Sequence, residues 1–253
     1  MKMILAVMYR EFRIRTTSMT WIFYDLFIPL LYLLIFGIAL NRTIGTGISL
    51  GGATLSYNAF FLAGVLSMAS FGIAINTAYG FFVDRDNGIF YEFLTYPMTR
   101  SEFLVGKILF NCLLAILQAA ITILFGALLL DIPLLWGRMG ILVVAVILAT
   151  AGWFFFLTSF ALRIKRNDMF NTFINLAYFV LMFASSIFYP LEGMPGWLRT
   201  AALLNPLTWH TDVLRFATVG DDSAVLLEAI AFLAFLLASF YLALRTLRYA
   251  IIK

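Results

Sequence analysis

The chain has 253 residues, of which 63% are hydrophobic, 17% aromatic and only 12% charged, and its mean hydropathy is +0.99. A soluble domain is about half apolar and about a quarter charged, and a globule this apolar would expose large hydrophobic patches and aggregate. The composition therefore excludes an ordinary soluble enzyme, a disordered chain and a disulfide scaffold, and it indicates a protein that crosses a membrane several times. The formal charge of +4 is expected to reflect asymmetry between the two membrane sides, with no nucleic acid as a partner.

The first segment, residues 1–19, is predicted to form a short amphipathic helix rather than a signal peptide, because charged residues interrupt its apolar run. Arg10 and Arg13 point away from an apolar face that recurs at helical spacing. That face consists of Ile4, Leu5, Met8 and Phe12. We expect this helix to lie on the membrane surface, and the alternative is a plain solvated flank.

Six apolar runs follow, each long enough to cross ~30 Å of hydrocarbon as a helix. They cover residues 21–40, 57–82, 108–130, 139–162, 169–189 and 224–244. The runs are continuously apolar, whereas the strands of a membrane barrel would alternate in polarity. We therefore expect an all-α membrane protein with six transmembrane helices in a single transmembrane domain over residues 1–253.

The orientation follows from the distribution of basic residues. With six spans both termini share one side, and 13 of the 17 lysines and arginines fall in the termini and loops of that side. Because basic residues accumulate on the cytoplasmic side, both termini are expected to be cytoplasmic in a multi-pass protein of the cytoplasmic (inner) membrane.

The cytoplasmic loop at residues 83–102 is more than a simple connector. Its first residues are charged, and Asn87-Gly88 is expected to end the preceding helix. Residues 89–94 present an apolar face, which predicts a short helix that Pro97 terminates, and Ser101 is expected to cap the third span. Such a helix could receive force from a soluble partner or could only anchor the loop, and the residues leave both alternatives open.

The outer segment at residues 188–222 is too apolar for a solvated loop. Pro195 is placed to begin one short helix, while Asn205 and Pro206 are placed to cap and begin a second. Each helix would have about ten residues, too few to span a bilayer, so we predict a re-entrant pair that forms a lid on the exit side. The alternative is an interfacial belt anchored by Trp197 and Trp209.

Several kinds of chemistry have no support in the residues. His210 is the only histidine, which excludes a histidine-rich metal site, and Gly106-Lys107 lacks the other residues of a phosphate loop. The spans carry few charges, and Asp25 and Glu228 are each expected to lie near an interface, about one turn into a span. The chain therefore has neither a nucleotide-binding motor nor an obvious ion-coupling group of its own.

Two stripes of residues recur within the spans. Small residues on the second span predict close helix packing. They are Ala59, Ala63, Ser67, Ser70, Ala74 and Thr77. The fifth span carries a polar stripe that either lines a pathway for an amphipathic molecule or joins helices. The candidate pathway residues are Tyr24, Asp25, Asn171, Asn175, Tyr178 and Met182.

The pattern as a whole resembles the membrane subunits of ATP-binding-cassette exporters of the second type (ABC type 2). Residues 1–19 are similar to that family's elbow helix, and residues 84–107 are similar to its acidic, glycine-containing coupling loop. The sharpest segment, residues 188–199, reads Phe-Tyr-Pro-Leu-Glu-Gly-Met-Pro-Gly-Trp-Leu-Arg. It continues through Leu204-Asn205-Pro206-Leu207-Thr208 to Asp212 and Arg215.

This resemblance implies a permease that dimerises, as a homodimer or heterodimer, in membrane lipid and pairs with two ATP-binding-cassette ATPase subunits. ATP and Mg would sit on those partner chains, and this chain would hold no cofactor, metal or catalytic residue. The residues implied in ATPase coupling are Asp84, Arg85, Asp86, Asn87, Gly88, Tyr91 and Glu92. The residues implied in the outer gate are Tyr189, Pro190, Trp197, Asn205 and Pro206.

The substrate stays open at this stage. Similar proteins export drugs, lipids, lipo-oligosaccharides or long glycans, and the segment ending at Asp212 and Arg215 is slightly more similar to drug-type and nodulation-type exporters than to polysaccharide permeases. Two alternatives belong to other classes: an ion-coupled carrier or channel that uses Asp25 or Glu228, and a membrane-embedded lipid enzyme that uses His210 with Asp212.

Overall fold

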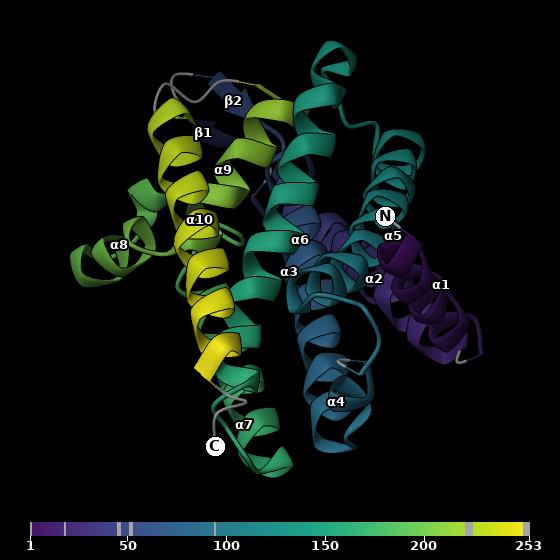
Figure 1. Cartoon of the computed structure of the whole chain (residues 1–253). Coiled ribbons are helices and arrows are strands. Elements are labelled where there is room, and N and C mark those ends of the chain that lie inside the picture. Colours follow the sequence, from purple (N-terminus) through teal and green to yellow (C-terminus); the bar gives the residue numbers. More distant parts are fainter. Residues whose placement is uncertain are drawn as a thin grey trace.

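The computed structural model describes residues 2–17, 19–44, 47–50, 53–93, 95–220 and 225–249. Within them, long helices lie side by side in a bundle (Figure 1). The long helices are α2 (Met19–Ile44), α3 (Tyr57–Asp86), α5 (Arg100–Leu130), α6 (Met139–Ala161), α7 (Asn167–Phe183) and α10 (Val225–Tyr249). The shorter helices are α1 (Lys2–Thr17), α4 (Ile89–Phe93), α8 (Gly196–Leu203) and α9 (Pro206–Thr218), with single 3₁₀ turns at Trp136–Arg138 and Leu191–Gly193.

Five segments of the described chain are long and apolar enough to cross a membrane. They are Ile22–Thr43, Tyr57–Asp86, Arg100–Leu130, Trp136–Ala161 and Val225–Leu247. The fifth predicted span corresponds to α7, which ends at Phe183 rather than at residue 189 and has 17 residues, or about 26 Å of helix. The chain is therefore a helical multi-pass membrane protein with five clear candidate spans and one shorter helix.

Helix α3 is the centre of the bundle. In its most apolar window, 89% of the residues are buried, whereas the corresponding value for α10 is 11%. The predicted stripe of small residues is buried throughout. A Cβ atom added at Gly64 would lie 2.7 Å from the carbonyl oxygen of Ile187, so the segment after α7 passes directly against α3. The predicted role of this stripe in close packing is confirmed.

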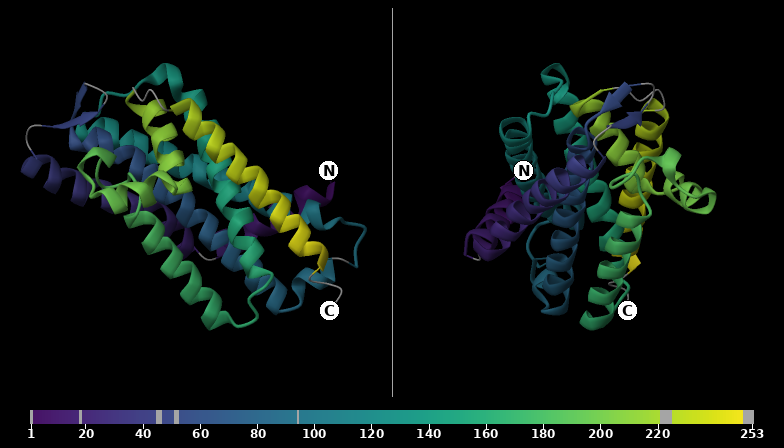
Figure 2. Two further views of the ribbon diagram at one scale, coloured as in Figure 1. Left: turned by 90° about the vertical axis from the view of Figure 1, so that its left-hand side faces the viewer. Right: turned by 180° about the vertical axis from the view of Figure 1, so that it is seen from behind.

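A small β-hairpin interrupts the expected all-α architecture. Strands β1 (Ile48–Leu50) and β2 (Ala53–Leu55) pair antiparallel between α2 and α3, with Ile48 opposite Leu55. Strands of three residues are too short to show the period-two alternation by which a sequence predicts strands. The hairpin and α4 lie at opposite ends of the bundle (Figures 1 and 2).

Helix ends around the loop at residues 83–102 follow local backbone chemistry. Helix α3 ends at Asp86, and Gly88 takes a φ of +79°, the left-handed conformation that glycine accepts readily. The predicted cap at Ser101 was wrong, because Thr99 caps α5: its hydroxyl accepts from the Glu102 amide at 3.2 Å, and the Glu102 carboxylate accepts from the Thr99 amide at 2.8 Å. This reciprocal capping box extends α5 to the N-terminal side of the predicted span.

Helix α1 packs chiefly against α5, but through a different face from the one predicted. Its buried residues are Val7, Glu11 and Arg15, whereas Leu5 and Phe12 are exposed. A Cβ added at Gly106 would lie 2.8 Å from the Cβ of Val7, so the two helices approach closely. The charged residues Glu11 and Arg15 thus face partners inside the bundle, while Leu5 and Phe12 of the predicted apolar face stay exposed.

The two short helices of the outer segment begin at the predicted residues. Pro195 is the N-cap of α8, and the Asn205 side chain caps α9 by accepting from the Leu207 amide at 3.0 Å. Helix α8 projects from the bundle (Figures 1 and 2), and its Trp197 is 75% exposed. Helix α9 instead packs among α3, α6 and α10.

Candidate functional site

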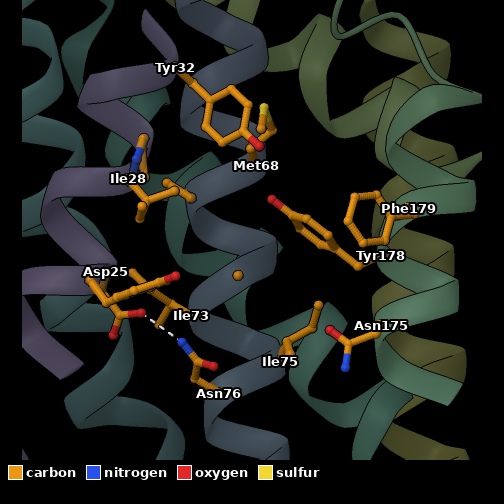
Figure 3. Close-up of a pocket in the computed structure, with 14 residues that line it drawn as sticks. Asp25, Ile28, Tyr32, Met68, Ile73, Ile75, Asn76, Asn175, Tyr178 and Phe179 are labelled. Atoms are coloured by element: carbon orange, nitrogen blue, oxygen red, sulfur yellow. Dashed lines mark hydrogen bonds between the residues drawn. The ribbon is translucent and has the colours of Figure 1, made fainter. Parts of the chain in front are cut away.

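A pocket of about 440 Å³ opens between α2, α3 and α7 (Figure 3). Its volume falls within the range of pockets that hold small organic ligands. Four of the predicted pathway residues line it, namely Tyr24, Asp25, Asn175 and Tyr178. Tyr32 also contributes, as do Asn76 and Phe179, two residues that were not predicted from the sequence.

The remaining two predicted pathway residues lie elsewhere. Asn171 is exposed, and its backbone oxygen accepts from the Asn175 side chain at 2.8 Å. Met182 is 1% exposed and belongs to the hydrophobic core. The polar stripe of α7 therefore splits: only Asn175 and Tyr178 reach the pocket.

Asp25 lies near the start of α2, as expected, but its side chain is buried against neighbouring helices. Its side chain accepts hydrogen bonds from Arg15 at 2.8 Å and from Asn76 at 2.7 Å. A buried carboxylate is tolerated when a cation and further hydrogen bonds compensate it. The compensating cation comes from α1, which the sequence analysis had placed on the membrane surface. Glu228 lies in the first turn of α10, as expected.

A second buried charge cluster lies nearer the loop at residues 83–102. The Lys107 ammonium, in a residue 2% exposed, donates to Glu11 and to Asp84, each at 2.8 Å. Arg10 donates to both carboxylate oxygens of Asp84, at 2.5 and 3.0 Å. Burial disfavours the charged form of Arg10, but its bonds to Asp84 outweigh this effect and raise the pKa of the guanidinium. The four formal charges cancel, which limits the cost of burying them.

The two clusters are connected through shared helices. Glu11 and Arg15 lie one turn apart on α1, and Lys107 and Asn111 lie one turn apart on α5. Asn111 accepts from Arg15 at 3.2 Å and donates to the Lys107 carbonyl at 2.8 Å. A cavity of about 360 Å³ lies beside both clusters. A polar path thus runs from Asp84, at the end of α3, to Asp25 in the pocket wall.

The predicted coupling residues divide into an inward and an outward group. Asp84 is 5% exposed, and Arg85 donates to the carbonyl of Ala161 and, at 2.9 Å, to that of Ile164, so neither presents its charge freely at the surface. The others lie at or near the surface. They are Asp86, Asn87, Gly88, Tyr91 and Glu92. Asp84, Arg85 and Asp86 are consecutive in the sequence, so the sequence alone could not separate the inward group from the outward group.

Helix α4 is fixed to the bundle by aromatic contacts. Phe90 is 1% exposed, and its ring lies 5.4 Å from the rings of both Phe81 and Phe103. Phe93 contacts Phe103 at 5.2 Å, and the Arg10 guanidinium lies 5.6 Å from the Phe93 ring. Helix α1, α4 and the end of α3 are therefore held together by charge and ring contacts.

The outer segment contains a third polar cluster. Asn205 donates to the carbonyls of Leu181 and Ala184, each at 2.7 Å, and thereby satisfies the end of α7. Arg215 pairs with Asp212, donates to the Ser186 carbonyl at 2.8 Å and lies 4.1 Å from the ring of Phe60. These bonds tie α9 to the segment after α7. Of the predicted gate residues, Asn205 is buried, Pro190 and Pro206 are half-buried, and Tyr189 and Trp197 are exposed.

His210 lies inside the bundle and is 1% exposed. Its Nδ1 atom is 2.9 Å from the Ser67 hydroxyl, and its ring stacks near Phe232 at 5.4 Å. Asp212 bonds to Ser186 at 2.8 Å and pairs with Arg215. These contacts join α9 to α3, to α10 and to the segment after α7.

Comparison with known proteins places this architecture in a family. A sequence model described as ABC-2 type transporter matches residues 3–218. The chain is 25% identical over 195 residues to a protein named as a transport permease, ycf38, of Porphyra purpurea, an alignment that covers 77% of this chain and 66% of the relative. It is 28% identical over 188 residues to the daunorubicin resistance ABC transporter permease protein DrrB1 of Streptomyces coeruleorubidus, covering 71% and 62% of the two chains.

A third relative, YbhR of Escherichia coli, is named as a multidrug ABC transporter permease and is 24% identical over 174 residues. That alignment covers 67% of this chain and 46% of the relative, so the chain spans at most 66% of the length of these three proteins. The family match covers most of the chain, including α1 and the outer segment through α9. The chain therefore belongs to the ABC-2 type transporter family.

Proposed function

We propose that this chain is the transmembrane subunit of an ATP-driven exporter that moves amphipathic molecules across the cytoplasmic membrane. Two copies, or this chain and a second permease, would stand on two ATPase subunits that bind ATP and Mg. The observation that carries the proposal is the polar path from Asp84 to Asp25, because it connects the loop at residues 83–102 with the pocket. A permease driven by a separate motor needs such a connection.

The loop at residues 83–102 would dock on the ATPase through its exposed residues. Tyr91 is 45% exposed, and Asp86 and Glu92 are exposed beside it. Asp84 and Arg85 would then act behind this surface, Asp84 through α1 and α5, and Arg85 through the turn between α6 and α7. In this division the exposed residues bind the motor and the buried ones transmit its movement.

Helix α7 would form the fifth of six spans, so that α10, the sixth, returns the chain to the side of its start. Its length of about 26 Å is close to the ~30 Å hydrocarbon thickness, a mismatch that local thinning or flanking residues accommodate. Six spans together with the excess of basic residues on one side support cytoplasmic termini. Helices α8 and α9 would then lie on the exit side, with Tyr189, Pro190, Trp197, Asn205 and Pro206 at the outer gate.

The pocket supports an amphipathic substrate, since Tyr24, Tyr32, Tyr178 and Phe179 provide apolar rings while Asp25 and the amides provide polar groups. Relatives named for daunorubicin resistance and multidrug transport favour a drug-like molecule. The alternative within this class is a permease for polysaccharides or lipo-oligosaccharides. The alternative of another class is an ion-coupled carrier, or a membrane-embedded lipid enzyme that uses His210 with Asp212.

Co-purification tests the docking part of the proposal. An ATP-binding-cassette ATPase subunit from the same organism would be co-expressed with the tagged permease, and the amount retained on it would be measured. We expect Glu92→Gln combined with Tyr91→Ala to reduce retention, because both side chains are exposed on the proposed surface. Glu192→Gln is the matched control, since Glu192 is also exposed but lies on the 3₁₀ turn before α8. Equal retention in all three proteins would contradict docking at this loop.

A further inference from the structure

The pocket between α2, α3 and α7 has a polarised wall. Among its lining residues, all within the described chain, Asp25 carries the one charge, and none is lysine, arginine or histidine. In Figure 3, Asp25 and Asn76 lie together on one side, while Tyr32 lies above them and the ring of Tyr178 lies across from them. A carboxylate beside several aromatic rings is a typical environment for an organic cation, which attracts both the negative charge and the ring faces.

Arg15 compensates Asp25 from outside this pocket. Arg15 lines the neighbouring cavity of about 360 Å³, and Asp25 does not. The Asp25 oxygens accept from Arg15 at 2.8 Å and from Asn76 at 2.7 Å, whereas an ionised carboxylate offers about four acceptor positions. The carboxylate thus stands between an internal cation on one side and an open pocket with no cation on the other.

We propose that this pocket selects protonated amines, with the Asp25 carboxylate as the recognition group and Arg15 as an internal competitor. The inference rests on the proposed role of the pocket as a substrate site and names the substrate class. An amine that enters the pocket gains a charge-assisted hydrogen bond to Asp25, while its apolar body packs on Tyr32, Tyr178 and Phe179. Because Arg15 and the amine compete for the same carboxylate, a stronger bond between Arg15 and Asp25 weakens the bond between Asp25 and the amine.

Charge-changing variants separate this mechanism from simple apolar binding. Arg15→Gln removes the competitor and leaves Asp25 to the ligand, which strengthens selectivity for the amine. Arg15→Gln combined with Asp25→Asn removes both charges, so no unpaired charge remains buried and the fold has the best chance of surviving. Asp168→Asn is the matched control, because Asp168 is an exposed acid outside the pocket.

Binding to the permease alone provides the test. The protein would be placed in nanodiscs of zwitterionic phosphatidylcholine, and fluorescence titration would compare naphthylethylamine with its uncharged analogue naphthylethanol, after subtraction of empty nanodiscs. We expect the native chain and Asp168→Asn to bind the amine about tenfold or more tightly than the alcohol, the ratio that one charge-assisted hydrogen bond supplies. The ratio should rise in Arg15→Gln and fall to about one in the double variant.

The proposal is overturned if the native chain binds amine and alcohol equally, or if the double variant keeps the native ratio while its thermal unfolding stays cooperative. If the double variant does not unfold cooperatively, the test rests on the native chain and on Arg15→Gln. An amine-to-alcohol ratio in Arg15→Gln equal to the native ratio also overturns the proposal. The titration contains neither ATP nor ATPase. Absence of ATP-driven export would therefore refute the proposed function without affecting the binding result. Equal binding of amine and alcohol would refute the amine selectivity without affecting the proposed function.

Discussion

Lys107 shows how much a single buried side chain contributes to this membrane domain. Its ammonium lies 2.8 Å from Glu11 on α1 and 2.8 Å from Asp84 on α3, so one residue of α5 joins three helices. From the sequence, Lys107 was part of an incomplete phosphate loop, the last residue of the segment that resembles a coupling loop, and one of the basic residues on the cytoplasmic side. No pattern in one sequence reveals that charged residues from α1, α3 and α5 meet in the interior.

Replacing Lys107 by methionine should strongly destabilise the protein. The substitution keeps the length of the side chain but leaves Glu11 and Asp84 with Arg10 as their remaining cation. Breaking a buried pair by removing one partner costs about 3–5 kcal/mol. Thermal unfolding of the detergent-solubilised protein would measure the change. Lys165→Met is the control, since Lys165 is exposed and should change stability little; equal unfolding of the two variants would refute the cluster.

Two glycines of α3, Gly64 and Gly72, differ in the space around them and allow a comparison of single substitutions. A Cβ at Gly64 would meet the Ile187 carbonyl at 2.7 Å, whereas a Cβ at Gly72 meets nothing within 4 Å. Gly64→Ala should therefore cost about 1–3 kcal/mol through overpacking. Gly72→Ala should be neutral or slightly stabilising, because alanine favours helix. Thermal unfolding distinguishes the two, and equal effects would contradict the close approach of the segment after α7.

At the scale of elements, the arrangement depends on how the ends of helices are tied together. Arg85, at the end of α3, binds the turn after α6, and Asn205, at the start of α9, binds the end of α7. Both supply donors to carbonyls that the helix itself leaves unpaired. The starts of α8 and α9 and the end of α3 were predictable from Pro195, Asn205 and Gly88, because those signals are local. The bonds across the bundle were not predictable, because they depend on tertiary packing.

Arg85→Gln should loosen the turn between α6 and α7 while the chain remains folded. The variant loses the charged donor to Ala161 and Ile164 and the contact with the Phe82 ring, which lies 4.5 Å from the guanidinium. We expect faster backbone hydrogen exchange at residues 162–166, measured by mass spectrometry.

Arg166→Gln serves as the control for this element, because the Arg166 side chain is 71% exposed and its recorded ion pair is a surface contact with Asp168. Its exchange at residues 162–166 should match that of the native chain. If Arg85→Gln exchanged at the same rate as the native chain, the hydrogen bonds of Arg85 would not be what holds the turn.

At the scale of the whole molecule, hydrophobicity determined what the sequence could predict. The six apolar runs gave the six long helices and their order, although α7 proved shorter and the hairpin β1–β2 was missed. The pocket was predicted in part: Tyr24, Asp25, Asn175 and Tyr178 line it, but Asn76 and Phe179 were not predicted. Helical periodicity identifies residues on one face of one helix, and a pocket is formed by faces of several helices whose rotations packing alone decides.

The position of α1 illustrates the same limit. Periodicity placed its apolar residues toward a surface and its charges toward water, yet Glu11 and Arg15 are buried. In a membrane, an outward apolar face contacts lipid without cost, so charged residues gain by turning inward to partners. The exposed apolar residues of α1 are compatible with the predicted contact with lipid, whereas the burial of Glu11 and Arg15 could not be predicted from the amphipathic pattern.

ATP-dependent transport into sealed vesicles tests the central claim most directly. The permease and its ATPase would be reconstituted together in liposomes, and uptake of the fluorescent compound daunorubicin would be followed with ATP present outside. The account predicts uptake that requires ATP and both subunits, and that is unaffected when a proton gradient is collapsed. Uptake that follows a proton gradient without ATP, or that persists without the ATPase subunit, would contradict it.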